Sequence, residues 1–199
     1  MSLDTDSSGN LYVGRTELRG GVETDWRLRK YTTSGTEITA GWNKLIDGDS
    51  STDSDMLRDI AADSAGNLYC AGVEDGSSTS ELAWLKKFAE DGTEDGGWDL
   101  QPGFTGNGSD ALAITVAPDG QIWTGGLFKN TESNYQWFIN EYNPDGSSTD
   151  CASVYYDAGF SRDNYFKDLC VGSAGNIYAL GYSRVDDGVK NMVSLRAYN

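Results

Sequence analysis

The chain has 199 residues, of which 25 are glycine and three are proline, and 15 basic against 31 acidic residues give it a formal net charge of −16. This charge excludes nucleic acid as a partner, because lysine and arginine supply most of the affinity for phosphates. The chain has no histidine, which excludes Ser-His-Asp and Cys-His catalysis within it, and no apolar stretch long enough for membrane insertion.

A turn followed by a strand recurs along the chain. It reads SSGNLYVG in the first copy, then SAGNLYCAG, PDGQIWTGG and SAGNIYALG. The turn glycines are Gly9, Gly66, Gly120 and Gly175, at intervals of 57, 54 and 55 residues. Glycine in a turn, followed by an apolar residue and an aromatic one, is typical of a hairpin that enters a strand.

Three further elements keep the same period. Alternating apolar segments such as MLRDIAADS precede the turns and predict an inner strand. The runs WRLRKY, AWLKKF, WFINEY and VSLRAY follow the turns and predict a third strand. The segments GWNKLID, GWDLQPG and ASVYYDAG predict an outer strand in the first three repeats. Each repeat therefore predicts four strands, and the last repeat lacks its outer one.

Four strands in about 55 residues is the size of a β-propeller blade. We therefore expect an all-β fold, a β-propeller built from about four four-stranded antiparallel blades, with the last blade incomplete. The expected blades span approximately residues 1–54, 55–108, 109–162 and 163–199 of a single domain. A larger ring would need missing repeats or self-association of chains to complete it. A two-sheet sandwich is the alternative fold.

Two segments carry a family resemblance. DIAADSAGNLYCAG (Asp59 to Gly72) and AWLKKFAEDGT (Ala83 to Thr93) resemble the bacterial β-propeller repeats of the SBBP type. The resemblance implies a propeller in an extracellular or cell-surface bacterial protein, usually without a known activity, and carries over no catalytic residue. The chain itself shows no signal sequence.

Aromatic residues in the outer segments are candidate ligand contacts. Trp42 and Trp98 occupy the same position of two repeats, and Tyr155 and Tyr156 lie near that position in the third. Exposed rings beside Asn or Asp side chains suit carbohydrate binding by stacking and hydrogen bonding. The alternative is an aromatic cover over the edge of a blade.

Clustered aspartates are candidate ligands for Ca²⁺, which binds oxygen atoms only. The segment DGDSSTDSD contains Asp47, Asp49, Asp53 and Asp55; the alternative is a solvated acidic loop. Asp59 and Asp168 share one position of the inner strand, where they would hold a cation or pair with Arg58 or Lys167. No other cofactor is implied.

The sequence favours a non-enzymatic binding or scaffold module that presents its loops to a protein or a glycan. The observations behind this hypothesis are the repeat, the lack of histidine and the lack of a catalytic constellation. One alternative is a glycan hydrolase or lyase that uses Asp, Tyr and Arg at the mouth of the channel. A second alternative is a purely structural spacer.

Overall fold

The protein is an all-β chain, as predicted. The computed structural model describes residues 1–21, 23–48, 54–75, 81–102, 108–130, 133–149, 154–156, 163–184 and 191–198. In these residues the chain forms antiparallel sheets and a short 3₁₀ helix, η1 (Gly96–Trp98). In the same residues, no helix is long and apolar enough to cross a membrane.

The described strands form four sheets in chain order. The first sheet contains β1 (Ser2–Thr5), β2 (Leu11–Arg19), β3 (Glu23–Tyr31), β4 (Glu37–Ile38) and β5 (Lys44–Ile46). The second contains β6 (Met56–Ala62), β7 (Leu68–Asp75) and β8 (Glu81–Phe88). The third contains β9 (Ser109–Val116), β10 (Ile122–Lys129), β11 (Tyr135–Tyr142) and β12 (Val154–Tyr156), and the fourth contains β13 (Asn164–Val171), β14 (Ile177–Arg184) and β15 (Asn191–Tyr198).

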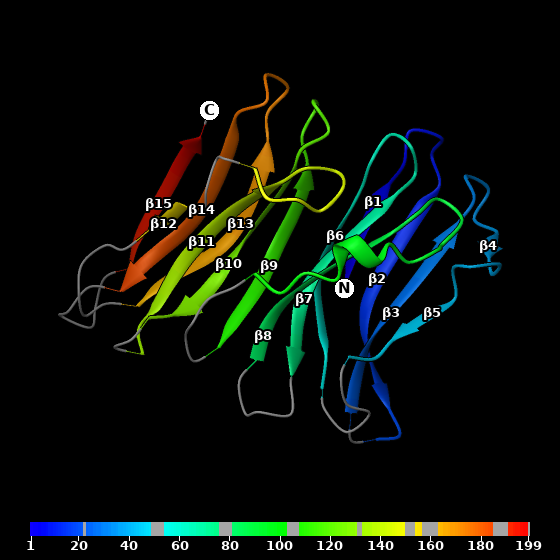
Figure 1. Cartoon of the computed structure of the whole chain (residues 1–199), viewed down its shortest axis with the longest axis horizontal. Coiled ribbons are helices and arrows are strands. Elements are labelled where there is room, and N and C mark those ends of the chain that lie inside the picture. Colours follow the sequence, from blue (N-terminus) through cyan, green and yellow to red (C-terminus); the bar gives the residue numbers. More distant parts are fainter. Residues whose placement is uncertain are drawn as a thin grey trace.

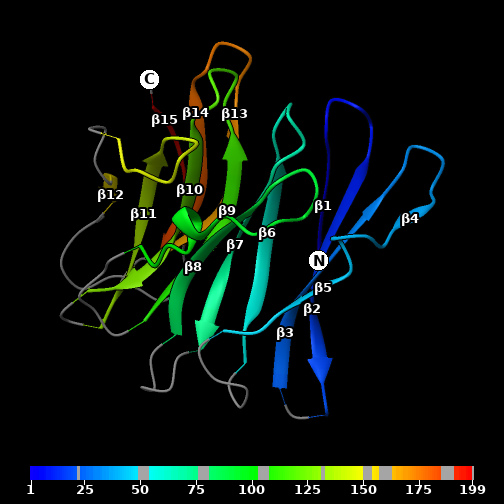
Figure 2. The same cartoon turned by 45° about the vertical axis from the view of Figure 1, so that its right-hand side comes forward.

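The four sheets stand side by side in one row (Figures 1 and 2). The inner strands β1, β6, β9 and β13 adjoin one another in that order. The first and fourth sheets lie at opposite ends of the array (Figure 1). Extensive contacts between described strands join only consecutive sheets. The described part is thus an open array, and it shows no closed ring.

The outer strands differ from the four-per-sheet prediction. In the first sheet the outer segment is split into β4 and β5, which both pair with β3. In the described part of the second repeat it is reduced to two isolated bridges, one between Phe88 and Glu94 and one between Leu85 and Leu100. η1 lies between these two bridges. The Asp95 side chain caps η1 by accepting a hydrogen bond from Gly97 N. Two consecutive glycines and this cap favour a turn over a regular strand.

The repeated turn is held by an aspartate in the first two sheets. Asp63 Oδ1 accepts hydrogen bonds from the backbone N–H groups of Ala65 and Asn67, both at 2.9 Å. Its Oδ2 accepts from Asn67 Nδ2 at 2.7 Å and from the Tyr69 hydroxyl at 3.3 Å. Asp6 repeats this arrangement in the first turn. The recurring motif is therefore a hydrogen-bonded turn that fixes the start of the second strand.

The interfaces between sheets are built by aromatic rings over glycines. A Cβ atom on Gly72 would lie 2.7 Å from Trp26 Cζ2, and one on Gly181 would lie 1.9 Å from Trp137 Cζ2. Trp26 and Trp137 are both fully buried. Glycine is needed at these two positions because the neighbouring sheet's ring occupies the space of a side chain.

Three of the four inner strands contain a β-bulge at the same position of the repeat. The pairing register shifts beside Arg58 in β6, beside Leu112 in β9 and beside Lys167 in β13. The bulges are 54 and 55 residues apart, the period of the repeat. A bulge re-aims the side chains around it, and Asp59 and Asp168 directly follow two of these bulges.

Candidate functional site

Asp59 ties three inner strands together. Its Oδ1 accepts a hydrogen bond from Ser2 Oγ of β1 at 2.7 Å, and its Oδ2 accepts one from Ile114 N of β9 at 3.0 Å. Burial raises the pKa of this carboxyl group, the bonds from Ile114 and Ser2 oppose the rise, and the charge of Asp168 adds to it. Both oxygens are thus engaged by protein donors, so Asp59 acts in the structure as a clamp between sheets.

The equivalent residue of the fourth sheet, Asp168, has fewer ties. Within the described part of the chain, its Oδ1 accepts a hydrogen bond from the adjacent Leu169 N, at 2.9 Å. Arg58 does not pair with Asp59; it forms a two-pronged ion pair with Asp110, with Nη2–Oδ2 at 2.7 Å. The bulge explains this choice, because it turns Arg58 toward the neighbouring strand β9. A cation between Asp59 and Asp168 stays a prediction.

Trp42 and Trp98 are buried, which contradicts the expectation of exposed sugar-stacking rings. Trp42 is 1% exposed and Trp98 is fully buried. Each ring packs edge-on against the aromatic residue after a repeated turn, Tyr12 or Tyr69, at 5.0 Å between centroids. Each indole N–H donates to a backbone carbonyl in the next sheet's outer turn, at 2.8 and 2.9 Å. The two tryptophans therefore fasten consecutive sheets, which is the alternative interpretation of the sequence.

Tyr155 and Tyr156 lie in β12, which pairs with β11. Their side chains fall outside the described part of the structure, so their predicted role stays a prediction.

A polar cavity of about 340 Å³ opens where the first and second sheets meet, on the side of the outer strands. It is lined by Asp47, Gly48, Glu74, Trp84, Lys86, Asp99 and Gln101. Its size lies in the range of small-molecule sites. Three carboxyl groups, one ammonium group and one amide converge on it, so it suits a ligand rich in hydroxyl groups.

The polar groups of the cavity are held in place by one another. Asp99 accepts hydrogen bonds from Trp84 Nε1 at 2.7 Å and lies 3.2 Å from Lys86 Nζ. Glu74 is buried and accepts a short hydrogen bond from Gln101 Nε2. The Lys86 ammonium group lies 4.5 Å from the centre of the Trp84 ring. Of the three carboxyl groups, the buried one of Glu74 and the exposed one of Asp99 are thus each held by a side-chain donor.

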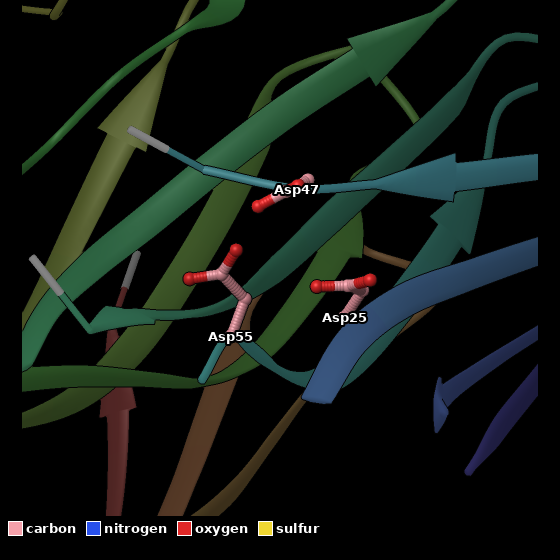
Figure 3. Close-up of side chains that lie close together, drawn as sticks. All are labelled: Asp25, Asp47 and Asp55. Carbon is pink, nitrogen blue, oxygen red and sulfur yellow. The ribbon is translucent and has the colours of Figure 1, made fainter. Parts of the chain in front are cut away.

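Three aspartates gather beside this cavity (Figure 3). Asp25 lies in β3, Asp47 follows β5 and Asp55 precedes β6, and one ligand atom from each lies within 4.8 Å of the others. Asp25 and Asp55 are 1% exposed. Burial and the charge of Asp47 raise the pKa of Asp25, and the charge of Arg19 opposes this. The structure thus brings Asp47 and Asp55 together, as the predicted metal site requires.

Sequence reasoning missed part of these sites and placed part of them elsewhere. The predicted ligands Asp49 and Asp53 lie outside the described residues. Asp25 was missed, although the register that pairs Trp26 with Ile46 places it beside Asp47. Glu74 and Asp99 were also missed, because neither belongs to a motif. The clue for Asp25 is a charged residue directly before the tryptophan of a buried strand.

Comparisons with known proteins show the fold. No protein-family model matches the chain, and no curated protein matches it. Among solved structures, the chain is similar to an alpha-L-arabinanase of Penicillium chrysogenum complexed with arabinobiose, with 12% identity, a TM-score of 0.54, and coverage of 94% of this chain and 62% of that one. It is similar to an endo-arabinase of Bacteroides thetaiotaomicron, with 12% identity, a TM-score of 0.55, and coverage of 98% and 73%. A thermostable family-43 glycoside hydrolase matches with 10% identity, a TM-score of 0.53, and coverage of 99% and 70%.

These neighbours have the β-propeller fold, and the chain spans less than two thirds of the first of them. They correct two expectations. The resemblance to SBBP-type repeats is not supported, since no family model matches. The expectation of a non-enzymatic binding or scaffold module is contradicted, because these neighbours of the same fold are named as arabinanases and a glycoside hydrolase.

Proposed function

We propose that the chain is a glycan-processing module that hydrolyses glycosidic bonds at the cavity between the first and second sheets. The observation that carries the proposal is the convergence of Glu74 and Asp99 on one polar cavity of about 340 Å³. Fold neighbours that act on arabinose-containing glycans support it. This places the chemistry on the outer-strand side, away from the inner strands where Asp59 is occupied as a clamp.

Hydrolysis of a glycosidic bond needs two carboxyl groups with different tasks. One donates a proton to the leaving oxygen, and the other activates a water molecule or attacks the anomeric carbon. Glu74 and Asp99 are the two groups we assign to these tasks. Gln101 orients Glu74, and Trp84 orients Asp99. The Lys86 ammonium group supplies a donor for the hydroxyl groups of the sugar.

The proposal also assigns the four sheets as consecutive blades of a propeller domain, and the protein as extracellular or surface-bound. Both assignments rest on the repeat period and on the propeller neighbours. A polymeric glycan is a substrate that a cell meets outside its membrane, which agrees with this location.

The test is a reducing-end assay of the whole chain on linear arabinan, arabino-oligosaccharides and a panel of other polysaccharides. Glu74→Gln and Asp99→Asn keep the shape of each side chain and remove its acid–base capacity. We expect each to lower kcat/KM at least about 100-fold, the usual share of an acid or base. Glu37→Gln, in β4 of the first sheet, is the control and should retain activity.

Two results would overturn the proposal. One is a folded wild-type chain that releases no sugar from any member of the panel. The other is activity that survives in both Glu74→Gln and Asp99→Asn, which would move the chemistry to another site.

A further inference from the structure

We propose that Asp25, Asp47 and Asp55 form a binding site for a divalent cation of the Ca²⁺ class. This inference is independent of the glycan chemistry, because it concerns an ion and can be measured without a sugar. Of the four aspartates predicted as ligands in the acidic segment, the proposed site keeps Asp47 and Asp55. It adds Asp25 from β3.

Three segments are fixed so that these carboxyl groups meet. β3 pairs with β5 through Trp26 and Ile46, which sets Asp25 beside Asp47. The Asp55 N–H donates to Thr24 O at 2.6 Å, which sets Asp55 beside the same strand. The site is therefore built by sheet pairing, and Figure 3 shows the three side chains converging.

Two buried oxygens of the cluster have no hydrogen bond from the described residues. They are Asp25 Oδ2 and Asp47 Oδ1. Asp25 is 1% exposed, its side chain lies beside those of the other two aspartates (Figure 3), and its Oδ2 is 3.6 Å from Arg19 Nη1. Leaving a buried carboxylate oxygen without a partner is costly, so buried charges are generally paired or bound to a metal.

Arg19 is too weak a partner to balance the charges of Asp25 and Asp47. Its Nη1 lies 2.6 Å from Asp47 Oδ2 and 3.6 Å from Asp25 Oδ2, so two carboxyl groups share one guanidinium. Its side chain is 46% exposed, so solvent screens its charge. Two carboxyl groups that share one screened guanidinium keep a net negative charge, which a divalent cation would neutralise.

The ligand set and its spacing fit Ca²⁺. All three residues offer oxygen, the ligand atom that Ca²⁺ and Mg²⁺ prefer. Ca²⁺ takes about six to eight oxygen ligands in a flexible geometry, whereas Mg²⁺ usually keeps several waters and binds through one or two carboxylates. The ligand atoms here lie within 4.8 Å of one another. One ion can therefore contact all three carboxyl groups, a number of carboxylates that favours Ca²⁺ over Mg²⁺.

The cluster also borders the cavity of the proposed active site. Asp47 belongs to both, and Gly48 N donates to Asp55 Oδ2 at 2.6 Å. A bound ion would hold this wall of the cavity in place. Ion binding would then stabilise the junction of the first two sheets.

The experiment is a calorimetric titration of chelator-treated, dialysed protein with CaCl₂ and, separately, with MgCl₂. We expect a single-site isotherm for Ca²⁺, weaker binding of Mg²⁺, and a higher Tm with Ca²⁺. Asp25→Asn and the more exposed Asp47→Asn should each weaken Ca²⁺ binding at least 10-fold. Asp119→Asn, in an exposed turn of the third sheet, should bind as the wild type does.

Asp47→Asn keeps the test valid if Asp25→Asn fails to fold. The proposal is overturned if the wild-type chain binds no Ca²⁺ at 10 mM, or if both variants bind it as tightly as the wild type. Because this titration contains no sugar, neither result tests the proposed hydrolysis. The reducing-end assay tests it separately.

Discussion

The first two sheets and the last two pack in the same way but differ in the hydrogen bonds of their repeated turns. Both halves bury a tryptophan over a glycine of the next sheet, Trp26 over Gly72 and Trp137 over Gly181. The turn aspartate of the first half, represented by Asp63, is absent from the second. The packing of a tryptophan on a glycine is therefore common to both halves. The turn aspartate can be lost, and the strands on either side of the turn still pair.

The third and fourth turns show how this loss is tolerated. Alanine occupies the aspartate position at residue 117 and glycine at residue 172. Backbone hydrogen bonds still close both turns, from Gly120 N to Ala117 O and from Gly175 N to Gly172 O, each at 2.9 Å. The backbone alone thus forms the turn, and the aspartate adds rigidity to it.

The largest effect is expected from filling the shared glycine position. In Gly72→Ala the new Cβ would lie 2.2 Å from Met56 O and 2.7 Å from Trp26 Cζ2. Backbone oxygen cannot move aside as a side chain can, so we expect a loss of about 3 kcal/mol in the free energy of unfolding. Urea unfolding measures it. Gly181→Ala should behave alike, and Gly96→Ala, which meets nothing within 4 Å, should be near neutral.

Gly72→Ala and Gly181→Ala also test whether the two halves of the array share the same packing. If only one of them destabilises the chain, the two halves do not share their packing constraint.

An intermediate effect is expected from the turn aspartate. Asp63→Ala removes the acceptor of four hydrogen bonds and leaves Asn67 and Tyr69 without it. We expect a loss of about 1–2 kcal/mol in the free energy of unfolding, again by urea unfolding. The reciprocal double variant Ala117→Asp/Gln121→Asn should stabilise the third turn. A destabilised double variant would show that the halves differ by more than the aspartate.

The smallest effect is expected from Asp59, and it depends on pH. Its pKa is raised in the folded state, so its contribution to stability is fully present below the unfolded value of about 3.9 and is lost as the pH rises through the folded value. In Asp59→Asn this loss disappears. We therefore expect the stability of the variant relative to the wild type to increase from pH 4 to pH 7.

Urea unfolding at several pH values measures this difference. Asp168→Asn, at the same position of the fourth sheet, is the matched variant. A wild type that instead gains stability over Asp59→Asn as the pH rises would contradict the raised pKa.

The sequence predicted the repeated parts of the fold and missed what lies between them. The glycine turns and the aromatic strand positions recur with a fixed period, so the strands of each sheet could be located. The exposure of Trp42 and Trp98 was misjudged, because an outer position was equated with an outward-facing ring. In the structure each ring turns beneath the edge and packs on Tyr12 or Tyr69.

The sites were only partly predictable because they join residues from different repeats. Asp47 and Asp55 were found as neighbours in an acidic segment, but Asp25 reaches them through the pairing of β3 with β5. Glu74 and Asp99 meet at a cavity formed by two sheets and the segment after η1. No local pattern encodes such a meeting.

The open array of sheets has a consequence for how the protein unfolds. The second and third sheets each pack against a sheet on both faces, whereas described residues cover the first and fourth sheets on one face. In such a linear array, stability is a sum of each unit and its nearest-neighbour contacts. Amide hydrogen exchange should therefore be slowest in β7 and β10 and faster in β14. The first and fourth sheets would then open before the two sheets between them.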